Sequence, residues 1–270
     1  MLKLPSVIIS SICLAFCNPA LSQEVSKGEM QAKLKAKDPL AIAIVCYHRS
    51  MWKQAIEAAT VALSKPMPLK DKINALELRS ESFLNIGDER HAYIDINEAM
   101  HLRKDIPMTR YLRRANIEIA LKMYADAAKD LTIMIDKPQA SKNGIYRTKD
   151  GMCTTTEALY FQRSSCYFKG GEYRKAIADY DVLLHMDPTS EEAFKMRGDC
   201  YAQIGQHKKA INDYTKAIEN DRESAGTSYF ARSLMYEKLG SKTQAEADRK
   251  RAGELGYVPS QKALNQDKKK

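Results

Sequence analysis

The residues best suited to chemistry in this sequence are five arginines, each of which precedes an aspartate by sixteen residues. The pairs are Arg79 and Asp95, Arg114 and Asp130, Arg163 and Asp179, Arg197 and Asp213, and Arg232 and Asp248. Such arginines can bind carboxylates of their own chain, or they can form a ladder for an acidic ligand. An arginine buried without its carboxylate costs about 3–5 kcal/mol. The regular spacing therefore predicts structural ion pairs, with the acidic-ligand ladder as the alternative.

The sequence has no pattern that is typical of catalysis or of metal binding. None of its five histidines stands three or four residues from another histidine or a cysteine, the spacing expected for metal ligands on a helix. Phosphate-binding loops, serine-nucleophile turns and zinc-protease motifs are also missing from the sequence. We therefore expect a protein that is not an enzyme and that uses no cofactor.

The arginine–aspartate pairs lie within a repeat of 34 residues. Several residues recur at this period, among them Gly171 and Gly205, Ala176 and Ala210, and Tyr180 and Tyr214. The clearer copies each show two runs with helical spacing of apolar residues, separated by a turn that contains glycine. One such helix pair cannot bury its apolar face alone, so the pairs are expected to stack. In an antiparallel pair, the arginine and the aspartate lie opposite each other, so each arginine can reach the aspartate of its own repeat or that of a neighbouring repeat.

The repeat resembles the tetratricopeptide repeat (TPR). Residues 157–190 carry its motif at Tyr160, Ser164, Tyr167, Gly171, Tyr173, Ala176, Tyr180 and Pro188, and residues 191–224 carry it at Phe194, Gly198, Tyr201, Gly205, Ala210, Tyr214 and Ala217. The resemblance implies an all-α fold, a right-handed α-solenoid of about six helix–turn–helix repeats. The copies are predicted at 36–69, 73–106, 108–141, 157–190, 191–224 and 226–259, with an insertion loop at 142–156 and a basic tail at 260–270.

The resemblance also implies that a partner binds in the concave groove, which the first helix of each repeat lines. The groove candidates are Leu84, Leu112, Asn116, Ile119, Phe161, Ser165, Phe168, Lys195 and Phe230, with Glu77 and Glu81 as acidic exceptions. Apolar residues there can receive an extended or helical peptide, and Asn116 can hydrogen-bond its backbone. The alternative is that neighbouring helices, or the insertion folded inward, cover these residues.

Composition and charge limit the class of partner. The chain has 270 residues, is 44% hydrophobic, and carries 43 Lys+Arg against 34 Asp+Glu for a net charge of +9. The apolar fraction excludes a disordered protein. The predicted pairs neutralise five arginines, and no basic block exceeds residues 268–270, so a nucleic-acid partner is not expected. The expected partner is another protein or a peptide, and the sequence does not indicate an oligomeric state.

Residues 1–22 have the pattern of a secretory signal peptide. Lys3 precedes an apolar run over residues 4–16, and Ala20 and Ser22 are small residues at the expected cleavage site. The apolar run is shorter than the roughly 20 residues needed to span a bilayer. We therefore expect export after cleavage, without a membrane span in the mature chain. The location would be periplasmic in a Gram-negative bacterium, and the protein would be secreted otherwise.

Four cysteines follow the predicted signal peptide. Cys166 and Cys200 fall at the same position of neighbouring repeats, where helices pack about 10 Å apart, too far for a disulfide. Cys153, in the insertion, can reach Cys166, and an oxidising compartment would permit that bridge. The Cys153–Cys166 disulfide is therefore a hypothesis, and it would hold the insertion over the fourth repeat.

Two functions are compatible with these features. The first is an exported scaffold or adaptor that binds a peptide or protein segment in the concave groove. The second is a structural spacer or assembly factor of an envelope complex, acting through the convex face and the ends of the array. The type of fold alone does not decide between them.

Overall fold

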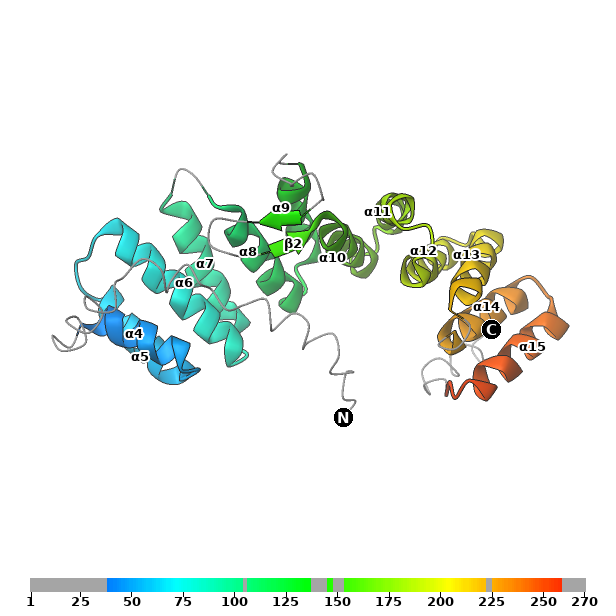
Figure 1. Cartoon of the computed structure of the whole chain (residues 1–270), viewed down its shortest axis with the longest axis horizontal. Coiled ribbons are helices and arrows are strands. Elements are labelled where there is room, and N and C mark those ends of the chain that lie inside the picture. The colour runs from blue at the N-terminus through cyan, green and yellow to red at the C-terminus, as the bar shows by residue number, and fades with distance from the viewer. Residues whose placement is uncertain (1–37, 104–105, 137–144, 148–152, 222–224, 259–270) are drawn as a thin grey trace. The chain divides into compact units, whose positions relative to one another are not determined.

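A computed structural model of the chain describes residues 38–103, 106–136, 145–147, 153–221 and 225–258 (Figure 1). The predicted signal peptide at residues 1–22 and the basic tail at 260–270 lie outside the described residues. Within the predicted insertion, only 145–147 and 153–156 are described. Contacts between residues divide the chain into two compact units, Met1–Leu159 and Tyr160–Lys270.

The described residues form twelve helices that follow one another as six antiparallel pairs (Figure 1). The pairs are α4 (Pro39–His48) with α5 (Trp52–Leu63), α6 (Leu69–Asn85) with α7 (Glu89–His101), α8 (Met108–Ala120) with α9 (Tyr124–Asp136), α10 (Thr156–Lys169) with α11 (Tyr173–Met186), α12 (Glu191–Gln203) with α13 (His207–Asn220), and α14 (Gly226–Lys238) with α15 (Lys242–Glu254). Each pair corresponds to one predicted repeat. The all-α helix–turn–helix fold that the sequence predicts is confirmed.

The turn inside each pair has the same backbone conformation in all six copies. Position 15 of the repeat has a positive φ, which is 75° to 79° at Gly87, Gly171, Gly205 and Gly240. Glycine suits this position because it has no Cβ to clash with the backbone. The other two copies place Ser50, with φ 56°, and Lys122, with φ 62°, at the same position. Residues 36–69 and 108–141, which lack the glycine, therefore share the register of the clearer copies.

Small buried residues let the two helices of a pair approach closely. Position 8 of the repeat holds alanine, serine or glycine in every copy, at Ala43, Ser80, Ala115, Ser164, Gly198 and Ser233, and position 20 is a fully buried alanine in all six. Larger side chains at these positions would force the helices apart. The motif positions that predicted the fold are thus the contact points that hold it together.

Gly198 provides a direct test of this packing. A Cβ at Gly198 would lie 2.8 Å from Cε1 of Tyr214, a ring that is itself buried. We expect Gly198→Ala to lower the free energy of unfolding by about 1–3 kcal/mol in urea titrations, because the ring has no space to move. A Cβ at Gly253, also in a helix, would meet nothing within 4 Å, so Gly253→Ala is the matched control. An equal loss in both variants would contradict the packing argument.

The insertion contains a short antiparallel β-hairpin, where the sequence predicts only a loop. Strand β1 (Ile145–Arg147) pairs with β2 (Cys153–Thr155), and Tyr146 lies opposite Thr154. β-Branched and aromatic residues in both segments favour an extended backbone. Helix α10 begins directly after β2, at Thr156, so the hairpin leads into the first helix of the fourth pair.

Candidate ligand-binding surfaces

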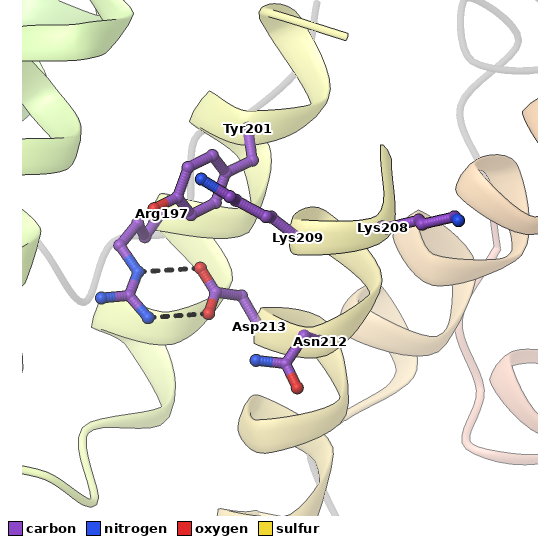
Figure 2. Close-up of a pocket in the computed structure, with 6 residues that line it drawn as sticks. All are labelled: Arg197, Tyr201, Lys208, Lys209, Asn212 and Asp213. Atoms are coloured by element: carbon purple, nitrogen blue, oxygen red, sulfur yellow. Dashed lines mark hydrogen bonds and ion pairs between the residues drawn. The ribbon is translucent and has the colours of Figure 1, made fainter. Parts of the chain in front are cut away.

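Each of the five predicted arginine–aspartate pairs forms a two-pronged ion pair within its repeat. Nε and Nη2 of the arginine donate to the two carboxylate oxygens of the aspartate, over 2.6–2.9 Å in all five pairs. Figure 2 shows this geometry for Arg197 and Asp213. The five aspartates are buried. Both oxygens of each carboxylate are therefore occupied by the protein's own arginine, which supports a structural role over a ladder for acidic ligands.

Four of these arginines also bind the preceding repeat. Each donates through Nη1 to a side-chain oxygen, over 2.6–3.0 Å. Arg79 donates to Thr60, Arg114 to Asn97, Arg197 to Asp181 and Arg232 to Thr215. All four acceptors occupy position 25 of the repeat before. This link between repeats was not predicted, because the acceptors differ in residue type and share only a side-chain oxygen. It joins neighbouring helix pairs within each unit.

Aromatic rings flank the same arginines. The guanidinium carbon of Arg197 lies 5.6 Å from the ring centre of Phe194 and 5.9 Å from that of Tyr201. Arg163 and Arg232 lie between two tyrosines each at similar distances. Contacts of this kind attract a cation to the ring face. The hydrogen bond to Asp213 raises the pKa of Arg197 further above its ordinary value, so this guanidinium stays charged.

In the first unit, the groove candidates Leu84, Leu112, Asn116 and Ile119 lie on α6 and α8. Leu112 is only 7% exposed, and Leu84 packs against the core formed by α7 and α8. Asn116 and Ile119 are half-buried. Leu112 is therefore a core residue, because the surrounding helices cover it. Fewer residues of the candidate groove in this unit are therefore open to a ligand than the sequence predicts.

A buried polar network crosses the same face of the first unit. Arg110 on α8 donates to Glu77 on α6, and the Arg113 guanidinium forms an ion pair with Glu81 at 2.8 Å. The Tyr47 hydroxyl, on α4, donates to the other oxygen of Glu81. The four charged side chains are 7–14% exposed. The sequence identified the two glutamates but not their partners, and the network neutralises them, so this face presents no free acid to a basic ligand.

In the second unit, Phe161, Ser165 and Phe168 form one row on α10. Both phenylalanines remain partly exposed, with their edges against rings of α11: Phe161 lies 6.2 Å from Tyr180 and Phe168 lies 5.5 Å from Tyr173. Residues three and four apart share a helix face, so the row presents two ring surfaces on either side of a hydroxyl. All three candidates of this row stay partly exposed on one helix.

The other two groove candidates of this unit differ from each other. Lys195 on α12 is half-buried, and its ammonium lies 3.0 Å from Asp199, which also accepts a hydrogen bond of 2.8 Å from the Tyr214 hydroxyl. Phe230 on α14 is 7% exposed, because Tyr257 covers its ring at 5.2 Å. Phe230 is therefore part of the core, and the candidate surface reduces to the α10 row and Lys195.

A separate pocket of about 320 Å³ opens between α12 and α13 (Figure 2). Its lining consists of Arg197, Tyr201, Lys208, Lys209, Asn212 and Asp213. Three of these side chains are cations and one is an anion. The pocket was not predicted from the sequence, because lysines such as Lys208 and Lys209 are common on the exposed face of any helix.

The cysteines of the second unit are core residues. Cys166 is 2% exposed and Cys200 is fully buried. Burial raises the pKa of the Cys200 thiol to about 12, so this thiol stays protonated. The side chain of Cys153 lies outside the described residues, and the Cys153–Cys166 disulfide stays a prediction.

Two further findings concern the described part of the chain. Across residues 38–258 with the gaps given above, no helix combines the length and the apolar character needed to cross a membrane. Over the same residues, histidine, cysteine and acidic side chains do not gather in groups of three that could hold a metal ion.

Comparison with known proteins identifies two repeats of a known family. Residues 191–224 match one family model described as Tetratricopeptide repeat, and residues 157–190 match a second model of the same description. These are the two copies with the most complete motifs. No curated protein matches the chain.

Solved structures share the fold. A crystal structure of MamA protein aligns with a TM-score of 0.56 and 18% identity, covering 70% of this chain and 100% of that one. The MamA 41-end structure from Desulfovibrio magneticus RS-1 aligns with a TM-score of 0.54 and 16% identity, covering 70% and 97%. YrrB, described as "a TPR protein with an unusual peptide-binding site", aligns with a TM-score of 0.53 and 16% identity, covering 79% and 100%. At these identities the similarity shows a fold in common.

Proposed function

We propose that this protein is an exported, non-enzymatic scaffold that binds a peptide or a segment of another protein. The observation that carries the proposal is the row of Phe161, Ser165 and Phe168 on α10, which stays partly exposed although its rings are apolar. Buried core residues need no partner, but apolar rings at the surface gain free energy when a partner covers them. The row also lies on α10, the first helix of its pair, and first helices line the groove that the TPR resemblance implies.

The chemistry of the row fits a peptide. The two rings can hold apolar side chains of a bound segment, while the Ser165 hydroxyl can donate to or accept from its backbone. Lys195 and Asp199, on the next helix of this face, are paired with each other and add a polar edge. A rigid stack of helix pairs holds these groups in place before binding, which lowers the entropy lost on association.

The fold in common with YrrB supports this reading, because YrrB is described as having a peptide-binding site. Export rests on the signal pattern of residues 1–22 alone. The proposed partner is therefore a protein that this chain meets outside the cytoplasm.

Blocking the row without removing its packing tests the proposal. We expect Ser165→Trp to reduce capture of the partner at least about tenfold in cross-linking from intact cells, because an indole would fill the space between the two rings. Ala178→Trp, at an exposed site on α11, is the matched control and should capture normally. Phe161 and Phe168 are poorer test sites, since both pack against tyrosines of α11 and their replacement would disturb the helix pair.

Two outcomes would contradict the proposal. Unchanged capture by a folded Ser165→Trp variant would show that the partner does not bind at the α10 row. It would favour the alternative function, a structural spacer that acts through other faces. A captured chain that still carries residues 1–22, instead of beginning at Gln23, would contradict cleavage and export. Circular dichroism of both tryptophan variants establishes that they are folded.

A further inference from the structure

The pocket between α12 and α13 carries an excess of positive charge that the protein does not neutralise. The Arg197 guanidinium is paired with Asp213 and with Asp181, a half-exposed acid on α11. Both oxygens of Asp213 are occupied by Arg197. The ammonium groups of Lys208 and Lys209 are exposed, and neither has an ion-pair partner among the described residues. The exposed lining is therefore cationic.

The preceding repeat shows how this charge is neutralised elsewhere. Lys175 occupies the position of Lys209, and both ammonium groups lie over a tyrosine, at 5.4 Å from Tyr167 and 5.3 Å from Tyr201. Lys175 also forms an ion pair with Glu172. The residue that corresponds to Glu172 in the later repeat is Gln206, which has no charge. Of these two repeats, residues 191–224, which form the pocket, therefore lack the glutamate that pairs with the lysine in residues 157–190.

The geometry favours an extended acidic ligand over a single small anion. In Figure 2, Lys209 extends across the Tyr201 ring while Lys208 points to the other side, and Asn212, on the lysines' own helix, also lines the pocket. One small ion cannot neutralise both ammonium groups when they point apart. A segment with several carboxylates can reach both, and Asn212 can donate a hydrogen bond to it.

We infer that this pocket binds an acidic segment, rich in aspartate or glutamate, of the partner protein. The inference deepens the proposed function and rests on it, since it gives the partner a second contact whose chemistry differs from that of the α10 row. Complementary charge at such a site increases the rate of association and selects among partners. The Tyr201 ring below Lys209 holds the ammonium in place, so it is oriented before the ligand arrives.

The test uses the purified full chain and a fluorescein-labelled peptide of alternating glutamate and glycine, followed by fluorescence anisotropy at low ionic strength. We expect Lys208→Gln with Lys209→Gln to weaken binding at least about tenfold, since both unpaired cations are lost. Gln206→Glu, which restores the acid of the preceding repeat, should weaken it roughly fivefold by neutralising Lys209. Lys175→Gln is the matched control and should change binding less than about twofold.

Several results would overturn the inference. If Lys175→Gln weakened binding as much as the Lys208→Gln and Lys209→Gln double variant, the peptide would be binding to the overall charge of the chain and not to the pocket. Stronger displacement of the peptide by inorganic phosphate than by acetate, at matched ionic strength, would assign the pocket to phosphate instead. Ser165→Trp should leave binding of the acidic peptide unchanged. The anisotropy assay therefore tests the pocket alone, and the cross-linking assay with Ser165→Trp tests the α10 row alone.

Discussion

Replacing Arg79 by methionine is expected to lower the free energy of unfolding by about 3–5 kcal/mol, because it leaves the Asp95 carboxylate buried without a counter-ion. Asp95 is 2% exposed, and its two oxygens receive hydrogen bonds of 2.7 Å from Arg79. Methionine keeps much of the length and the apolar contacts of the side chain and removes the charge. Urea titration of the full chain measures the loss.

Removing both partners should cost less than removing one. The double variant Arg79→Met with Asp95→Leu buries no charge, so we expect it to be more stable than Arg79→Met alone. Lys216→Ala, which breaks an ion pair whose two side chains are about half exposed, is the surface control and should cost no more than about 1 kcal/mol. A loss in Arg79→Met no larger than in this control would show that the pair contributes little to the fold.

The effect should also reach the neighbouring repeat. Arg79 donates to Thr60 on α5, so its loss removes a hydrogen bond between the first two helix pairs as well as the two to Asp95 within the second. In repeat proteins the stability of each unit depends on the interface with its neighbours. Hydrogen exchange should therefore become faster in α5 as well as in α6 and α7, in contrast to a purely local defect.

The sequence predicts the contacts of these arginines within a repeat but not those between repeats. Equal distances from the turn place Arg79 opposite Asp95, so spacing predicts this partner, with the aspartate of a neighbouring repeat as the alternative, and the structure shows Asp95. The acceptors at position 25 are threonine, asparagine or aspartate, residue types that are common at helix surfaces for other reasons. Only the structure shows that their side-chain oxygens share one role.

The candidate groove shows a different limit of prediction. The repeat register indicates which residues face the first helices of neighbouring pairs, but it does not indicate what covers them. Phe230 has the register of a groove residue, yet Tyr257 lies on it, and nothing in the repeat motif distinguishes it from Phe161. Likewise, Lys122 adopts the positive φ of a glycine because the tight turn between α8 and α9 requires it, which overrides the preference of a single residue.

Glu118 is the departure from the repeat motif with the largest expected consequence. It occupies position 11 on α8, where other copies carry a ring such as Phe83 or Tyr201, and it is 2% exposed. Its nearest cation is Arg114, whose Nε lies 3.7 Å from Oε1 but only 2.7 Å from Asp130. Two buried carboxylates therefore share one guanidinium, and Oε2 of Glu118 has no hydrogen-bond partner among the described residues.

The surroundings of Glu118 raise its pKa from 4.5 to about 7. Burial is the main cause, followed by the charge of Asp130, with Asp126 adding to it; Arg114 and the Tyr93 hydroxyl act in the opposite direction. Because the folded chain holds this proton more tightly than the unfolded chain does, the contribution of Glu118 to stability is greatest below pH 4.5. It is lost as the pH rises through about 7 and does not change further above that.

Glu118→Gln should remove this dependence on pH. Glutamine keeps the shape of the protonated acid and cannot ionise, so the variant should be more stable than the natural chain at pH 8 by up to about 3 kcal/mol, the free energy that corresponds to the rise in pKa. Below pH 4.5 the two chains should be equally stable. Urea titrations across this range measure the difference, with Glu246→Gln, at an exposed site of α15, as the control.

A fall in stability between pH 4.5 and 7 that persists in Glu118→Gln would assign it to other groups and contradict the argument. The expected result has a structural reason that applies only to residues 108–141. An arginine at position 7 can neutralise one buried carboxylate completely, and in the other copies that carry the pair the second site holds a ring that needs no counter-ion. Where Glu118 replaces the ring, a second buried carboxylate has no counter-ion of its own, and its ionisation is the source of a pH-dependent cost in this repeat.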